Sequence, residues 1–580
     1  MTSEDLVVVA VPGIQQFLTW SRSTADVAGA SAIVSELVRV AAAEVMDSAS
    51  LVMPSTDRTS TPNRLVITAP AGSGHKIAAR VVKIINAAWA TRVESIANGM
   101  SQETKTAWLA AASHASGFPM GRWVVVPPLP GGYGEQWESA QQAMNARKRI
   151  RDFPPISERQ VQLCTMTGRW PAVESATLAR LKVRTRRGEA LSVPAVVKRR
   201  TGGGFPSTWS IATGGFRRDV IAAAGRDHDL QKAVHELRDV VAELGRHRVN
   251  TGKGRLPGLT GDAWLADVEG AWLLPESWDA DGIARDHDRA AKPDASLCER
   301  GRRAAANLII AANKASISAP TPYLAVVVQD ADSMGKRLGR LPAGRSNLRS
   351  WHGVVSSALA QAATGGQHVL ESKHLGRVVY AGGDDFLGLT PAATALSAVS
   401  DLNSAFVTAV GAALPGATAS AATVFFHASS PLQSVLTSAR DLLDEAKEAG
   451  RPGLGVAVLH RGGERSRFVR RWEADAPAPP GTAAVTRIQT LAAVMRRGLS
   501  GRLATRLEQD SRHLAELSEH WQRRELARLV WRHSGMGSAG ALDAETVENV
   551  TDALLALGAA DGTKSDVVTV ARFAAGIECE

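Results

Sequence analysis

Hydrophobic and polar residues alternate with two different periods between residues 323 and 460. Apolar runs of strand length, such as 323–329 (YLAVVVQ), are separated by stretches in which apolar residues recur every three or four positions, as in an amphipathic helix. The runs RVVYA and FLGLT flank the turn at 382–385 (GGDD) as the two strands of a hairpin. The predicted order, β-α-β-β-α-β, is that of a ferredoxin-like sheet with its helices on one face.

The N-terminal part of the chain begins with the same pattern. A strand (LVVVAV) and helical stretches are followed by a second strand at 63–69 (NRLVITA) and a helix at 75–93. This half has no comparable acidic turn. We therefore interpret it as a degenerate copy of the later domain.

The remaining regions have different compositions. Residues between the two copies mix basic loops (RRTGGGFPSTWS) with helices, a Pro-rich linker occupies 474–482, and amphipathic helices follow it. The prediction is an α+β multidomain protein with two ferredoxin-like palm/nucleotide-cyclase domains, a middle α-rich region and a C-terminal α-helical domain. The predicted ranges are 1–150 (degenerate palm), 151–317 (middle), 318–470 (GGDD palm) and 482–580 (helical).

Composition narrows the class of protein. A chain of 580 residues that is 44% hydrophobic can bury several cores. Three scattered cysteines, an N-terminus without a secretory-signal layout and the lack of a long apolar run favour the cytoplasm and exclude a membrane span. The net charge of +10 suits a nucleic-acid or nucleotide partner, although a general bias toward arginine explains it equally well.

The acidic turn carries the strongest chemical signal. The first strand of the predicted sheet leads into Asp330-Ala331-Asp332, and this strand neighbours the central hairpin, so Asp330 is expected beside Asp384 and Asp385. Clustered carboxylates repel each other unless a cation is present. Two Mg²⁺ or Mn²⁺ ions held there with substrate phosphates would support nucleotide transfer.

Gly-Gly-Asp-Asp is also an ordinary soluble turn, so the neighbouring residues decide its interpretation. Gly382 and Gly383 allow positive φ and leave room for a base or ribose. Asp-Ala-Asp lies at the neighbouring strand end, and a following helix carries 444–447 (DEAK), whose lysine could reach a triphosphate. The combination favours a nucleotidyltransferase.

Five segments resemble a known family. The pair 329–336 (QDADSMGK) and 380–389 (YAGGDDFLGL) resembles the large polymerase/cyclase subunit of type III CRISPR effector complexes. Segments 12–38, 62–66 (PNRLV) and 205–213 (FPSTWSIAT) favour its Cmr-type (III-B) branch. These matches span most of the chain.

The resemblance implies an RNA-guided antiviral complex. On binding target RNA, its large subunit would convert ATP to cyclic oligoadenylates with release of pyrophosphate. The implied partners are guide RNA, target RNA and other Cmr-type subunits, including small helical ones. The resemblance assigns catalysis and metal binding to Asp330, Asp384 and Asp385, further metal contacts to Ala331 and Asp332, the border of the ATP pocket to Gly382 and Gly383, and triphosphate contacts to Lys336 and Lys447.

The chain also departs from the family pattern. It begins directly with the first palm-like segment, so we expect no N-terminal HD nuclease domain. The segment 162–170 resembles a zinc-binding element but contains only Cys164. Because a tetrahedral zinc site needs about four ligands, we predict no zinc.

Two other functions fit parts of the sequence. A stand-alone cyclic-dinucleotide cyclase also has a Gly-Gly-Asp-rich hairpin, but here the turn continues Asp-Phe rather than Glu-Phe, and the roughly 300 residues before it suit a large assembly. A scaffold that binds guide and target RNA with a silent active site is the other alternative. A silent site has no physical need to keep three mutually repelling carboxylates.

Overall fold

The computed structural model describes fifteen ranges of the chain. They are 4–11, 13–45, 49–55, 62–113, 118–150, 162–186, 188–247, 249–252, 254–286, 292–382, 384–460, 463–472, 483–534, 542–558 and 564–576. The predicted linker at 474–482 lies outside the described residues, as does Gly383. Among the helices that the described residues form, none has the length and apolarity needed to cross a membrane.

The N-terminal sheet has the strand order β2-β3-β1-β4, and every pairing is antiparallel. Helices α2 and α3 cover one face, where they bury Val7 and Val9, while α5 covers the other face with Trp137. The elements are β1 (Glu4–Ala10), α1 (Ile14–Thr19), α2 (Thr24–Val45), β2 (Ser50–Met53), β3 (Arg64–Pro70), α3 (Gly74–Ser95), α4 (Gln102–Ser113), β4 (Arg122–Val126) and α5 (Gly132–Arg149).

The second sheet has the order β10-β9-β8-β5-β7-β6. Its last four strands, β8-β5-β7-β6, repeat the N-terminal order β4-β1-β3-β2, so both copies are ferredoxin-like. The elements are β5 (Tyr323–Ala331), α14 (Met334–Leu338), α15 (Leu348–His368), β6 (Arg377–Gly382), β7 (Asp385–Pro391), α16 (Ala395–Gly411), β8 (Ala419–His427), α17 (Leu432–Glu448), β9 (Gly453–His460) and β10 (Gly463–Arg471), with a π-turn at Val369–Lys373 and a 3₁₀ turn at Ala392–Thr394.

Two details of the second sheet differ from the prediction. The helices are not all on one face: Ala325 and Val327 pack with α16, whereas Val326 and Val328 pack with α17 on the opposite face. The additional helix is needed because β8 and β9 are parallel and require a crossover connection. Strand β10, which pairs antiparallel with β9, was not predicted.

Residues of the middle region contribute to two hydrophobic cores. Its first part, with α6 (Ser175–Arg180), α7 (Val193–Thr201) and α8 (Thr208–Ala212), packs into the core of the N-terminal copy. A separate core lies among the remaining elements, which are α9 (Gly214–Ala224), α10 (His228–Gly245), α11 (Ala263–Asp267), α12 (Ala280–Asp286), α13 (Ala295–Lys314) and 3₁₀ turns at Gly270–Leu273 and Pro275–Ser277. The four domain ranges stay a prediction.

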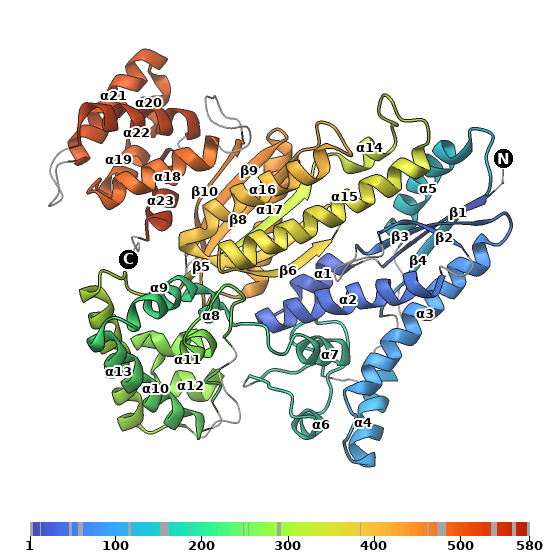
Figure 1. Ribbon diagram of the computed structural model, residues 1–580, viewed down its shortest axis with the longest axis horizontal. Helices are drawn as coiled ribbons and strands as arrows, with labels where there is room; N and C mark the ends of the chain where they lie inside the picture. The colour runs from blue at the N-terminus through green and yellow to red at the C-terminus, as the bar shows by residue number, and fades with distance from the viewer. Residues whose placement is uncertain are drawn as a thin grey trace.

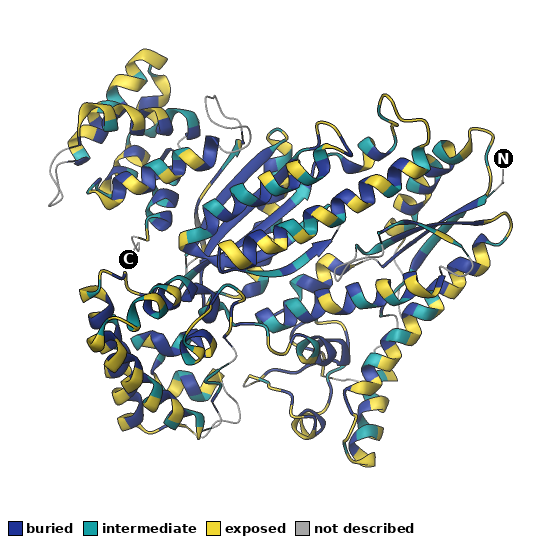
Figure 2. Cartoon of the chain, viewed as in Figure 1, coloured by how far each residue is buried: buried dark blue, intermediate teal, exposed yellow. Residues whose placement is uncertain are grey.

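The C-terminal helices gather beside the second sheet, at the far end of the molecule from the N-terminal sheet (Figure 1). Their outward faces are mostly exposed (Figure 2). Phe573 of α23 attaches them to the sheet, with its ring 5.0 Å from that of Tyr323 on β5. The helices are α18 (Ala483–Arg496), α19 (Arg502–Gln509), α20 (Ser511–Glu516), α21 (Glu519–Ser534), α22 (Ala544–Leu557) and α23 (Lys564–Ala574).

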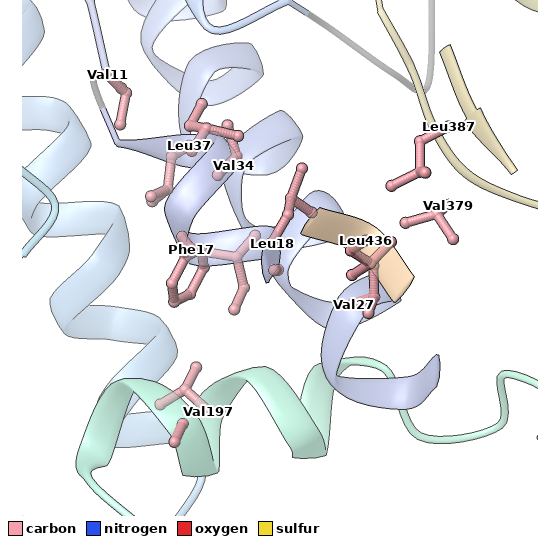
Figure 3. Packing of buried hydrophobic residues seen from close by; sticks show 14 of the residues in the cluster. Val11, Phe17, Leu18, Val27, Val34, Leu37, Val197, Val379, Leu387 and Leu436 are labelled. Atoms are coloured by element: carbon pink, nitrogen blue, oxygen red, sulfur yellow. The ribbon is translucent and has the colours of Figure 1, made fainter. Parts of the chain in front are cut away.

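The two ferredoxin-like copies share one hydrophobic core. Phe17 and Leu18 of α1 belong to the same buried cluster as Val379 of β6, Leu387 of β7 and Leu436 of α17 (Figure 3). Apolar burial of this extent stabilises the contact between the copies. The hairpin with the acidic turn therefore faces the N-terminal copy. The predicted fold class, α+β with two ferredoxin-like palm domains and helical regions, is confirmed.

Candidate active site

The acidic turn lies where β6 and β7 meet beside the end of β5. Asp330 stands directly opposite Asp385 in the β5–β7 register, and the Ala331 amide donates a 3.0 Å hydrogen bond to the Asp384 carbonyl. Asp330, Asp384 and Asp385 are thus brought together, as the strand order predicted. Antiparallel pairing of a strand end with a hairpin is what produces this convergence.

A glycine is needed at position 382 for a different reason from the one predicted. It is not among the residues with positive φ. A Cβ atom on Gly382 would lie 2.7 Å from the Tyr380 hydroxyl, which also donates a 3.3 Å hydrogen bond to the Gly382 carbonyl. The glycine therefore makes room for a tyrosine that borders the site. Nothing is described for Gly383.

The surroundings of Asp384 and Asp385 disfavour the charged form of both carboxyl groups. Burial raises the pKa of Asp384, and the charge of Asp330 adds to the effect. Burial also raises the pKa of Asp385 well above its usual value, together with a hydrogen bond to Asp330 and the charge of Asp384. Burial and the same two aspartates raise the pKa of the Tyr380 hydroxyl. The site thus lacks enough positive charge to keep its acids ionised.

Helix α17 supplies a cation to the site. The Lys447 ammonium lies 2.5 Å from Asp330 Oδ2, so this predicted triphosphate contact reaches the acidic cluster. One turn and two turns earlier, Asp444 and Arg440 face the same cavity. Arg440 Nη1 also donates a 2.6 Å hydrogen bond to the Gln15 carbonyl, which fixes α17 to α1.

Asp332 and Lys336 are placed elsewhere. The buried Asp332 carboxylate accepts hydrogen bonds from the hydroxyls of Thr418 (2.8 Å) and Ser420 (2.7 Å), and Arg451 Nε lies 3.6 Å away. Lys336 is exposed on α14 and lines neither cavity beside the acidic turn. Asp332 therefore connects β5 to β8, and we omit both residues from the proposed site.

Replacement of Asp332 by asparagine is expected to lower the free energy of unfolding by about 1–3 kcal/mol, because a buried charged acceptor of two hydrogen bonds is lost. Urea unfolding measures this change. The shift in Tm caused by Mg²⁺ should be the same as in the unsubstituted chain. A variant that unfolds normally but has lost the Mg²⁺ shift would contradict this assignment.

The N-terminal copy contributes an arginine at the position equivalent to Asp385. In the first sheet Ala10 pairs with Arg64, exactly as Asp330 pairs with Asp385 in the second. The N-terminal copy therefore has a guanidinium at the first residue of β3, where the second copy has a carboxylate at the first residue of β7. Burial lowers the pKa of Arg64, and the charge of Asp384 opposes that shift.

Two cavities meet at the acidic turn. One of about 710 Å³ lies between α1, the end of β5 and α17, and one of about 330 Å³ lies between β3, α5 and α15. Both are lined by Gln15, Asn63, Lys148 and Asp385. Each is large enough for a small-molecule ligand. The arrangement places carboxylates between two ligand-sized spaces whose walls come from both copies.

Unpaired hydrogen-bond donors belong to two residues that line the smaller cavity. Arg64 Nε and Nη2 are buried and have no acceptor among the described residues, and the same holds for Trp137 Nε1 on α5. The Arg64 guanidinium lies over the Trp137 ring, 5.7 Å from its centroid. Buried donors without acceptors are costly. Their concentration at one place indicates an anionic ligand.

Local sequence reasoning did not find Arg64, Lys148, Tyr380 or Arg440. The signal for Arg64 was available in the alignment of the two copies, since NRLV and DDFLGL occupy the same position in their sheets. Lys148 ends the α5 helix in a basic run and gives no such signal.

The residues fit a divalent cation in chemistry, although not as a complete ligand set. Within the described ranges, no group of three or more His, Cys, Asp or Glu side chains is arranged to hold a metal ion. Asp330 pairs with Lys447 instead. Mg²⁺ commonly uses one or two carboxylates and completes its shell with water and substrate phosphates. Asp384 and Asp385, whose pKa values are raised, are the donors that a cation would relieve.

Addition of Mg²⁺ or Mn²⁺ is expected to raise the Tm at about pH 7.5 and to have a smaller effect at about pH 5. The folded-state pKa values of Asp384 and Asp385 lie above the value of 3.8 for an ordinary aspartate. Their destabilising effect therefore begins as the pH rises through 3.8 and is complete above the raised values, where a cation can offset it. Thermal melts at both pH values measure the shift, and an equal shift in a D384N/D385N variant would place the cation elsewhere.

Comparisons with known proteins agree with this geometry. The family model described as Cas10/Cmr2, second palm domain, matches residues 323–454. The CRISPR system Cmr subunit Cmr2 of Pyrococcus furiosus is 30% identical over 181 residues, a match that covers 27% of this chain and 21% of that protein. The match thus spans about a fifth of the length of that relative.

Two solved structures have a similar fold. The apo state of the type III-B Cmr-beta complex contains a chain that aligns with a TM-score of 0.62 at 14% identity, over 95% of this chain and 81% of that one. The same complex bound to cognate target RNA gives a TM-score of 0.56 at 12% identity, over 96% and 83%. The family model covers β5 to α17 and so includes the acidic turn; these residues therefore match the second palm domain of the Cas10/Cmr2 family, and the two solved structures show that the overall fold is shared.

Proposed function

We propose that this chain is the large subunit of a Cmr-type, RNA-guided CRISPR complex and that it converts ATP to cyclic oligoadenylates, with release of pyrophosphate, when the complex binds target RNA. The observation that carries the proposal is the position of the acidic turn between two cavities with walls from both ferredoxin-like copies. Joining two nucleotides is favoured by two neighbouring binding spaces and by charge stabilisation between them.

The chain's own residues divide into two groups with different roles. Asp330, Asp384 and Asp385 provide negative charge at the junction of the cavities. Arg64 and Lys148 provide positive charge and donors on the wall from the N-terminal copy, suited to the phosphates of a nucleotide. Divalent cations bound by the carboxylates would stabilise the attacking 3′-oxygen and the leaving pyrophosphate.

The larger cavity supports a second nucleotide. Lys447 and Arg440 face it from α17, and Tyr380 borders it from β6. Lys447 now pairs with Asp330, so a triphosphate in this cavity would compete with that carboxylate for the ammonium group. Orientation of the two nucleotides toward each other by these cations accounts for the directionality of the transfer.

The test is reconstitution of the complete complex with guide RNA, Mg²⁺ and ATP, with and without complementary target RNA, followed by mass spectrometry of the products. The proposal expects cyclic oligoadenylates only with target RNA. GTP in place of ATP separates this function from a cyclic-dinucleotide cyclase, which would make product from GTP without target. An assembled complex that yields no nucleotide product under any of these conditions would leave a scaffold with a silent site.

A further inference from the structure

A second pair of cavities shares no lining residue with the two at the acidic turn. One of about 630 Å³ is bordered by α2, α3 and the segment between α6 and α7, and one of about 460 Å³ is bordered by α2 and β6. Both are lined by Thr201, Gly203, Gly204 and Phe205. They therefore form one continuous depression, which we call the basic groove.

The basic groove carries an excess of positive charge that the protein does not neutralise. Seven Lys or Arg and two acidic side chains line its larger part. Three of the basic residues are paired: Arg199 with Asp26 (2.9 Å) and Glu189 (2.6 Å), Arg22 with Glu189 (3.7 Å), and Arg92 with Glu36. The other four have no carboxylate partner among the described residues; they are Lys182, Arg184, Arg186 and Arg200.

Three of these four cations are close together in the chain. Lys182, Arg184 and Arg186 are exposed, whereas the intervening Val183 is buried and Thr185 is half-buried. Lys182 lies in the turn that follows α6, with φ of 53°, and Arg184 and Arg186 lie in the irregular segment after it. This segment thus presents three exposed positive charges within five residues, and Arg200 adds a fourth near the end of α7.

A glycine loop also lines both cavities. Helices α2 and α7 approach so closely that a Cβ on Gly202 would lie 1.8 Å from the Ala25 carbonyl, which fixes the loop against α2. Gly204 follows with φ of 100° and has open space around it. Phe205 lies where the two cavities meet, and Arg377 lies 5.0 Å from the centroid of its ring. The loop offers exposed backbone to a ligand, and the half-buried Phe205 ring borders both cavities.

We propose that the basic groove binds the phosphodiester backbone of a single-stranded nucleic acid. A groove with unneutralised cations and an aromatic ring has the features used to bind single strands without regard to sequence. A nucleic-acid strand carries one negative charge per nucleotide, whereas a protein ligand would need several clustered carboxylates to neutralise these four cations. The cavity volumes suit a few nucleotides of one strand and are too small to enclose a duplex.

The groove also runs toward the acidic turn. Its smaller part is lined by Val378, Val379 and Ala381 of β6, and Ala381 immediately precedes Gly382. A strand bound in the groove would therefore lie against the hairpin that carries Asp384 and Asp385. The binding itself does not depend on the proposed nucleotide chemistry, so the two can fail separately.

Fluorescence anisotropy with the full chain tests the proposal. The probes are labelled 15-nucleotide uridine RNA and the deoxyuridine oligomer of equal length, titrated at several salt concentrations. The variant K182Q/R184Q/R186Q/R200Q is expected to bind at least ~10-fold more weakly at about 0.1 M salt, with the slope of log K against log salt reduced by up to ~3, since each neutralised phosphate on a single strand contributes about 0.7. Equal affinity for the two oligomers indicates backbone contacts alone, and tighter binding of RNA adds contacts to its 2′-hydroxyls; both support the proposal.

The matched control removes the same number of positive charges, one lysine and three arginines, from another surface. Arg226, Lys232, Arg246 and Arg303 are exposed on or beside α9, α10 and α13 and do not line the groove. The variant R226Q/K232Q/R246Q/R303Q is expected to bind like the unsubstituted chain. Equal loss in both variants would overturn the proposal in favour of general charge attraction. Unchanged binding by the groove variant, or tighter binding of poly-glutamate than of either oligomer, would overturn it as well.

Discussion

Replacement of both Asp384 and Asp385 by asparagine is expected to reduce the nucleotide product of the reconstituted complex by at least ~10³-fold, because charge stabilisation at the reacting atoms is commonly the largest contribution to catalysis. The same double substitution is expected to raise the free energy of unfolding of the metal-free chain. Activity and stability should thus change in opposite directions.

The expected stabilisation follows from the direction of the pKa shifts. Burial and neighbouring carboxylates raise the pKa of both residues in the folded state, so ionisation there is harder than in the unfolded chain. Below the unfolded-state pKa of 3.8, the carboxyl groups are protonated in both states and do not oppose folding. Above that pKa they ionise more readily in the unfolded chain than in the folded one, so they oppose folding as the pH rises. The stability difference between variant and parent should therefore appear at neutral pH and vanish in acid.

Urea unfolding at about pH 7 and about pH 3.5 measures the difference, and mass spectrometry measures the product. The matched control is D229N/D239N, which removes two exposed carboxylates of α10 and should change neither quantity strongly. A double variant that loses stability at neutral pH would mean that the carboxylates have a structural role. Full activity in that variant would exclude them from the reaction.

The sequence was sufficient for the parts of the site that depend on local periodicity. Strand period and turn composition predicted the β6–β7 hairpin, and the ferredoxin-like order placed Asp330 beside it, as the register with Asp385 confirms. The order also indicated the duplication. Each of these features follows from residues close together in the chain or from a known strand order.

What the sequence did not reveal depends on packing between distant segments. The side of the sheet that α17 covers follows from the parallel pairing of β8 with β9, which no local pattern specifies. The hydroxyls of Thr418 and Ser420, almost ninety residues away, decide the direction of the Asp332 carboxylate. Arg64 became a candidate only when the two sheets were compared strand by strand.

Arg64→Gln is expected to lower kcat/KM for ATP about 10- to 100-fold in the complete complex, with little loss of stability. A hydrogen bond from a charged donor contributes about 1.5–3 kcal/mol, which corresponds to roughly this range. In the ligand-free chain, by contrast, Arg64 Nε and Nη2 have no acceptor among the described residues, and burial lowers the pKa of the guanidinium. The contact with the Trp137 ring is worth about 2 kcal/mol at a desolvated site, and removal of two buried donors without acceptors, at about 1–3 kcal/mol each, offsets its loss.

Initial rates over a range of ATP concentrations, together with urea unfolding, separate the two effects. Arg64→Lys keeps the charge but lacks the planar guanidinium, so its kcat/KM should lie between those of the parent and Arg64→Gln. Arg80→Gln, which removes an exposed arginine of α3, is the matched control and should leave both measurements unchanged. A loss of several kcal/mol in unfolding free energy would mean that Arg64 stabilises the contact between the two copies. An unchanged kcat/KM would mean that Arg64 lines the smaller cavity without contacting the substrate. In that case the proposal that a nucleotide binds in the smaller cavity would be wrong.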